Sequence, residues 1–376
     1  MTDQHNVING RGTQALIATA LIALAPLAGL ALGDRPIGET LHWPPQPPTI
    51  DHPDLNPWAF AFALAVVLVA ITPLTWWIAR MHRDGWRTRG WGLPYWGWAG
   101  AVLLVGSWAS AWGLLPVATT VREHSFTALW LGYVVVMQGL TRHRAGRCLL
   151  TEHPWRLLAL FPASAAFWWL FEYLNQFAGN WQYSGSGLSG WGYFLVSTLP
   201  FATVIPAVVS TRDLLATTRL RRAFQPCPRI GPAASRGAAV AALAGGIAAL
   251  MALPLAPAVL FPVVWLAPTA ILVAVQRFGG EHRLLDGLAR GDWRELELAA
   301  LAGLVCGVFW ELWNTASLAR WTYEIPYVGA LHVFEMPLLG YAGYLPFGVC
   351  AIATATLILD RPGAIDLDQS AFPAIR

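Results

Sequence analysis

The chain has 376 residues, of which 56% are hydrophobic and only 12% are charged, and its mean hydropathy is +0.49. A soluble domain carries roughly 25% charged residues, so this composition excludes a soluble enzyme, a disordered chain and a secreted disulfide scaffold. The net charge of +3 gives no indication of nucleic-acid binding. The four cysteines form no CxxC pair, so neither a redox motif nor a structural zinc site is expected.

Ten apolar runs are long enough to cross a bilayer as helices, for which about 20 residues are needed. In chain order they are residues 14–33, 57–79, 94–116, 124–141, 157–178, 189–210, 237–253, 257–276, 295–315 and 333–359. The first run is longer than a usual signal-peptide core, so we expect an uncleaved helix there. The proline-rich stretch 34–54 after it is expected to form an extended external loop. The sequence therefore predicts an all-α, polytopic integral membrane helical bundle of about ten transmembrane helices.

Arginine is concentrated in every second loop, and the chain contains no lysine. The clusters are Arg80, Arg83, Arg87 and Arg89; Arg142, Arg144 and Arg147; Arg212, Arg219, Arg221, Arg222, Arg229 and Arg236; and Arg277, Arg283, Arg290 and Arg294. Loops rich in arginine stay on the cytoplasmic side of a membrane. We therefore expect a multi-pass protein of the inner (plasma) membrane with both termini in the cytoplasm.

Two segments of the chain share one order of polar and aromatic residues, namely Glu-x-x-Asn followed by Trp-x-Tyr. The matching residues are Glu172, Asn175, Trp181 and Tyr183 in the first segment, and Glu311, Asn314, Trp321 and Tyr323 in the second. The two segments are four runs apart, so both copies have the same orientation in the membrane, as in a parallel duplication. This pattern predicts three units: two N-terminal helices and an external loop in 1–92, a first four-helix repeat in 93–236, and a second repeat with a short cytoplasmic tail in 237–376.

Carboxylates inside a membrane are costly and are usually kept for a function or for a partner. Glu172, Glu311 and Glu335 are therefore the candidate catalytic residues. Packing of the two copies about a pseudo-twofold axis would bring Glu172, Asn175, Glu311 and Asn314 toward one central cavity open to the outer leaflet. The alternative is that each Glu-Asn pair only satisfies a helix end and the adjoining loop. The candidate substrate-binding residues are Asn175, Asn314, Trp181, Tyr183, Trp321, Tyr323, His332 and Arg320.

The chain contains no P-loop, GxGxxG, GxSxG or HExxH motif, so any chemistry must use carboxylates, amides and aromatic rings within the bundle. A carboxyl group that is removed from water favours its protonated form and can act as a general acid. The faces of Trp and Tyr stabilise a nearby cation. Together these groups are suited to protonating an alkene and guiding a carbocation, and the natural substrate would be an apolar polyisoprenoid in the bilayer.

The stretches from Glu172 through Trp181-Gln182-Tyr183 to Pro200, and from Glu311 through Trp321-Thr322-Tyr323 to Glu335-Met336-Pro337, resemble the tandem repeats of membrane-embedded lycopene cyclases and the related carotenoid hydratases. That family carries two acids directly after the proline of its repeat, whereas Glu335 precedes Pro337 and Pro200 has no acid beside it. The resemblance covers about a third of the chain. It implies a redox-neutral cyclisation or hydration of a carotenoid-like lipid without a cofactor, with Glu311 or Glu335 as the proton donor.

Three other kinds of protein remain open at this point. Parallel repeats with broken helices are common in transporters. Glu172, Glu311, His332 and Glu335 could instead hold a metal ion, although a single histidine disfavours a two-metal centre. A non-catalytic binding or scaffold subunit is the remaining alternative. The expected partners are the bilayer and a lipid or polyisoprenoid substrate, and the sequence does not predict an oligomeric state.

Overall fold

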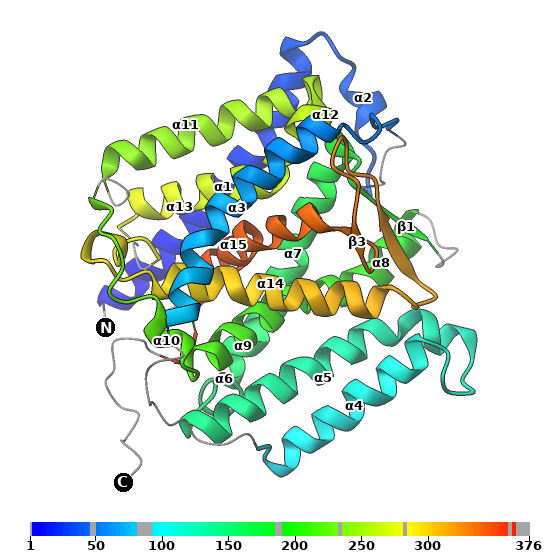
Figure 1. The fold of residues 1–376 in the computed structure, drawn as a ribbon, viewed down its shortest axis with the longest axis vertical. Coiled ribbons are helices and arrows are strands. Elements are labelled where there is room, and N and C mark those ends of the chain that lie inside the picture. The colour runs from blue at the N-terminus through cyan, green and yellow to red at the C-terminus, as the bar shows by residue number, and fades with distance from the viewer. Residues whose placement is uncertain are drawn as a thin grey trace.

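Long helices make up most of the computed structural model, and short strands lie at one end of it (Figure 1). The structure describes residues 2–45, 50–80, 92–184, 190–231, 235–280, 284–359 and 363–365. Arg83, Arg87, Arg89 and Arg283 of the predicted loops lie outside these residues. The longer helices are α1 (Thr2–Leu32), α3 (Pro57–Arg80), α4 (Tyr95–Ala111), α5 (Thr119–Ala145), α7 (Pro154–Ala178), α8 (Gly190–Phe201), α9 (Val204–Ala216), α11 (Arg236–Ala252), α13 (Val263–Phe278), α14 (Arg294–Asn314) and α15 (Tyr344–Thr356).

Seven helices within the described residues are long and apolar enough to cross a membrane. They are Gly10–Leu32, Pro57–Ala79, Pro154–Ala178, Gly190–Ala216, Arg236–Leu255, Arg294–Asn314 and Leu338–Thr356. The other predicted runs also contain helices, but α4 has 17 residues, α13 has 16, and α5 carries arginines at both ends. The chain is therefore a multi-pass helical membrane protein, and the number of ten crossings remains a prediction.

Helices α9, α14 and α15 pack against one another at the centre of the bundle. Most residues of α9 and α15 are buried, because other helices cover them on several sides. Helix α1 packs against α11 and α13. The Ala23 carbonyl oxygen of α1 accepts a hydrogen bond from the Tyr173 hydroxyl of α7 at 2.6 Å. Helices α4 and α5 run side by side along the edge opposite α11 (Figure 1). Only 6% of the α3 span is buried, so its apolar side chains face outward, as expected next to lipid.

Glycines set the closest approach in the centre, between α14 and α15. A Cβ atom added to Gly303 would lie 2.3 Å from the Tyr344 carbonyl oxygen, and one added to Gly348 would lie 2.3 Å from the Ala299 carbonyl oxygen. Small residues allow transmembrane helices to approach closely, which increases their van der Waals contact. A Cβ atom on Gly307 would collide with the Tyr344 ring, so these glycines also fix where that tyrosine lies.

Two pairs of short strands add to the helices. Strand β1 (Trp181–Ser184) pairs antiparallel with β2 (Arg320–Tyr323), and β3 (His332–Val333) pairs with β4 (Met336–Pro337). They lie at the end of the bundle away from the short helix α10 (Leu220–Ala223) (Figure 1). The prediction of an all-α fold missed them because the strands are only two to four residues long and lie between or at the edge of apolar runs.

Two predicted boundaries are wrong. The last run does not begin as a helix at residue 333, since β3 and β4 occupy its start and a 3-10 turn, Leu338–Gly343, precedes α15. Pro337 fixes its own φ and has no N–H group, so regular helix follows it rather than passing through it. Arg212 is not a loop residue after a span ending at 210, because α9 continues to Ala216 and buries it completely.

The glycine contact yields a stability prediction. Gly303→Ala should lower the free energy of unfolding by about 1–3 kcal/mol, because the added methyl group forces α15 away from α14. Gly245→Ala in α11 is the matched control, since nothing lies within 4 Å of its Cβ position. That control should be neutral or stabilising by about 0.5–1 kcal/mol. Thermal unfolding of the two purified variants measures the difference, and equal stability would contradict the close helix contact.

Candidate functional site

The two Trp-x-Tyr motifs meet in the β1–β2 ladder. Trp181 lies opposite Tyr323, and Tyr183 lies opposite Trp321, so the pairing is symmetric about its centre. The rings of Tyr183 and Trp321 are 6.5 Å apart. The structure thus brings together two motifs that are separated by 140 positions in the printed sequence.

Glu172 is buried in α7 and is bound by three donors. Its Oε1 accepts hydrogen bonds from the Trp168 indole at 2.8 Å, the Trp181 indole at 3.0 Å and the Tyr183 hydroxyl at 2.6 Å. Trp168 is one helical turn before Glu172, whereas the other two donors come from β1. A single carboxylate oxygen therefore holds the strand against the helix.

Glu311 occupies the matching position in α14 and is completely buried. Its Oε1 accepts from the Tyr323 hydroxyl at 2.7 Å and from the Tyr344 hydroxyl at 2.6 Å. The Trp321 indole donates to the Tyr323 hydroxyl at 2.8 Å. The second carboxyl oxygen, Oε2, is buried and has no hydrogen-bond partner among the described residues. One carboxyl oxygen of Glu311 is thus anchored by two hydroxyls, and the other is without a partner among the described residues.

The two asparagines hold the backbone that follows each helix. Asn175 Nδ2 donates to the Trp181 carbonyl oxygen at 2.8 Å, and its Oδ1 accepts from the Asn180 N–H at 2.8 Å. Asn314 Nδ2 donates to the Trp321 carbonyl oxygen at 2.7 Å, and its Oδ1 accepts from the N–H of the same residue at 2.9 Å. Each amide therefore bonds the backbone of the strand that follows its helix, as the alternative of a satisfied helix end and adjoining loop predicts.

Aromatic rings fill the space between the two carboxylate networks. Phe347 of α15 is completely buried, and its ring centroid lies 5.7 Å from that of Trp168 and 5.8 Å from that of Trp310. Trp310 stacks on Tyr344 at 6.0 Å. One aromatic cluster therefore borders both Glu172 and Glu311.

Of the other predicted site residues, Glu335 is the least exposed. It is half-buried in the turn between β3 and β4. The sequence predicted that Glu335 lies at the start of a helix. That prediction is wrong, because Glu335 lies between the paired strands β3 and β4. His332 and Arg320 have exposed side chains in β3 and β2. Within the described ranges, no group of three or more His, Cys, Asp and Glu residues is gathered closely enough to hold a metal ion.

Sequence reasoning missed three residues of the site: Trp168, Tyr344 and Phe347. Trp168 could have been found, because it precedes Glu172 by four positions and residues at this spacing share one face of a helix. Tyr344 and Phe347 belong to a helix that is distant in sequence, so no local pattern points to them. Comparison with protein-family models, with curated proteins and with solved structures finds no match to this chain.

Burial raises the pKa of the Tyr183 and Tyr323 phenols well above the ordinary value of 10.0, and the neighbouring carboxylates Glu172 and Glu311 raise it further. Both hydroxyls therefore remain donors in alkaline solution. The unfolded chain releases these protons near the ordinary value, while the folded chain retains them. Their stabilising contribution is thus complete below that pH and is lost as the pH rises toward the folded pKa.

These shifts predict an alkaline titration. The free energy of unfolding should decrease above pH 10.0, and it should decrease less steeply in Tyr183→Phe and Tyr323→Phe. In the folded protein, tyrosinate absorbance near this pH should be the same in wild type and in either variant, because neither phenol has ionised. A smaller tyrosinate signal in a folded variant would show that the replaced hydroxyl titrates normally.

Proposed function

We propose that this protein is a multi-pass membrane enzyme that protonates a polyisoprenoid or carotenoid-like lipid, with Glu311 as the proton donor. The observation that carries the proposal is the unsatisfied Oε2 of Glu311, buried beside an Oε1 that accepts two tyrosine hydroxyls. A buried carboxylate oxygen without a donor is costly. A proton on Oε2 neutralises the buried charge and supplies the hydrogen that an alkene would receive.

The reaction that fits these groups is redox-neutral. The proton of Glu311 Oε2 adds to one carbon of a substrate double bond, and the other carbon becomes a cation. A second double bond of the same molecule attacks this cation to close a ring, and a proton then leaves a neighbouring carbon; in a hydration, water attacks the cation and then loses a proton. Trp310 and Tyr344 present aromatic faces that stabilise positive charge. The half-buried Glu335 is suited to return a proton from solvent to Glu311.

The repeat supports this assignment of roles. We propose that 93–236 and 237–376 are duplicated four-helix units, because Glu172 and Glu311, Asn175 and Asn314, and the two strands make matching contacts. Glu172 Oε1 already receives three donors, which favours a supporting role for the first copy. This is the chemistry expected from the resemblance to lycopene cyclases and carotenoid hydratases, and it requires no cofactor.

A scaffold protein is the second candidate, and the Glu172 network favours it. There the carboxylate, the indoles and the hydroxyl bind one another and hold β1 in place, without any further requirement. If Glu311 served only the same purpose, its replacement by glutamine would be tolerated.

The test uses purified protein in lipid nanodiscs with lycopene or squalene as the substrate, in D₂O. Wild type should form an isomer or a hydrated product that carries one deuterium on carbon for each protonation, detected by mass spectrometry. Glu311→Gln keeps the shape of the side chain but removes the transferable proton, so the rate should fall about 100-fold or more with little change in unfolding temperature. Glu172→Gln is the matched control from the other copy and should retain most activity.

Glu311→Ala separates catalysis from stability. Loss of the shared acceptor leaves the Tyr323 and Tyr344 hydroxyls unsatisfied and should lower the free energy of unfolding by about 1–3 kcal/mol. Unchanged lycopene and squalene with wild type, or full activity in Glu311→Gln, would contradict acid catalysis and leave the scaffold protein as the better explanation.

A further inference from the structure

A second, basic site lies at the opposite end of the bundle from the strands. The cleft is small and open to solvent, and it is lined on one side by Arg147, Glu152, His153 and Arg156. These residues form the corner between α5, the short helix α6 (Leu149–Glu152) and α7. Gly363 and Ala364 of the C-terminal segment line the other side. We propose that this cleft binds the phosphate group of a membrane phospholipid or of another phosphorylated molecule.

The charges of the cleft favour an anion. Among the described residues that line the cleft, two carry a guanidinium group, one an imidazole and one a carboxylate, and guanidinium groups bind phosphate through paired hydrogen bonds. Helix α7 begins at Pro154 in this corner, and the His153 side chain does not cap it. The positive end of the helix dipole therefore adds to the same field.

The position of the cleft at the end of a membrane-spanning helix fits a lipid head group. The apolar span of α7 begins at Pro154, so the cleft lies at the end of a helix that is long and apolar enough to cross the bilayer. Basic pockets between transmembrane helices at this level bind phosphorylated head groups. Glu295 lies in the first turn of α14 and pairs with Arg212, which donates a hydrogen bond to Ile365 beside the cleft. Glu311 lies 16 positions farther along the same helix, which is about 24 Å at 1.5 Å per residue. The cleft is thus separate from the carboxylate site, and the inference does not depend on the proposed enzyme.

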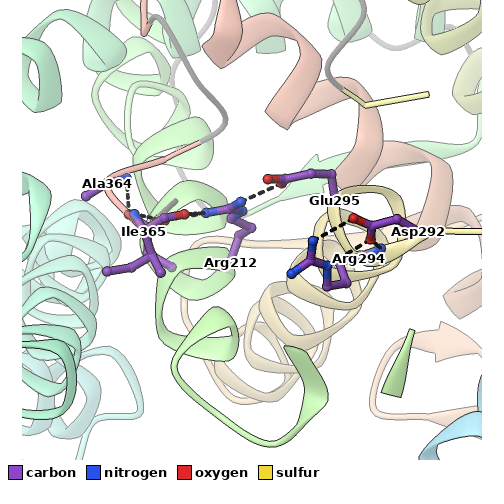
Figure 2. Close-up of polar contacts among 7 residues, drawn as sticks. Arg212, Asp292, Arg294, Glu295, Ala364 and Ile365 are labelled. Atoms are coloured by element: carbon purple, nitrogen blue, oxygen red, sulfur yellow. Dashed lines mark hydrogen bonds and ion pairs between the residues drawn. The ribbon is translucent and has the colours of Figure 1, made fainter. Parts of the chain in front are cut away.

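A buried ionic cluster holds the C-terminal wall of the cleft (Figure 2). Asp213 Oδ2 accepts the Ala364 N–H at 2.8 Å, and Arg212 Nη1 donates to the Ile365 carbonyl oxygen at 2.7 Å. Arg212 also pairs with Asp213 at 2.9 Å and with Glu295 of α14 at 2.5 Å.

Removing one partner of such a buried pair is costly, so the cluster fixes its neighbours firmly. Helices α9 and α14 together therefore position the segment that closes the cleft.

The test measures ligand binding by the full chain in detergent, by native mass spectrometry and by thermal shift. The probes are dioleoyl phosphatidic acid, dioleoylglycerol, which lacks the phosphate, and inorganic phosphate. Wild type should bind phosphatidic acid in preference to dioleoylglycerol. Arg147→Gln and Arg156→Gln should each weaken that binding roughly tenfold, the effect of losing a charged hydrogen bond.

Two further variants make the result specific. Arg142→Gln removes the same charge from an exposed position one turn before the cleft and should bind like wild type. Gly363→Ala changes no charge, but its Cβ would lie 2.0 Å from Asp213 Oδ1, so it should displace the wall and weaken binding.

The phosphate probe identifies the ligand source. A thermal shift with inorganic phosphate supports a site for any phosphate group, and a shift with phosphatidic acid alone supports a lipid site. Equal binding of dioleoylglycerol and phosphatidic acid, or an equal loss in Arg142→Gln, would overturn the proposal.

Discussion

Inside a bilayer no water completes the hydrogen bonds of a polar group, so a buried polar side chain is costly unless it finds a partner within the chain. This constraint explains why the four Glu and Asn side chains at the ends of α7 and α14 determine so much of the structure. Their carboxylate and amide groups draw β1 and β2 back onto the helices, and the strands then pair with each other. At the other end, Arg212 and Asp213 impose the same constraint and fix residues 364 and 365.

Hydropathy was sufficient to locate the helices, because every run of apolar residues long enough for a membrane contains one. The Glu-x-x-Asn and Trp-x-Tyr order also identified most residues around the two carboxylates, since these contacts are local in sequence. Contacts between distant helices could not be found in this way, and Tyr344 and Phe347 are the examples. Arg212 was misplaced because an arginine after an apolar run usually marks a loop, whereas here Glu295 and Asp213 compensate its charge inside the bundle.

The two carboxylates show how similar local structure can support different chemistry. Both accept a tyrosine hydroxyl from the following strand, and both border Phe347 and its neighbours. The difference lies in the remaining donors. Trp168 and Trp181 complete the Glu172 network from α7 and the strand that follows it, whereas Tyr344 reaches Glu311 because glycines on α14 admit α15 so closely. A change in helix packing therefore alters the environment of an acid without altering its own motif.

The β1–β2 ladder also has a mechanical consequence. It joins the segment after α7 to the segment after α14 through backbone hydrogen bonds, which depend little on side-chain identity. Separation of α7 from α14 at this end would have to break the ladder and part Tyr183 from Trp321. The ladder thus acts as a hinge that keeps this end closed, and any large opening of the bundle must occur among the helix ends at the arginine-rich side.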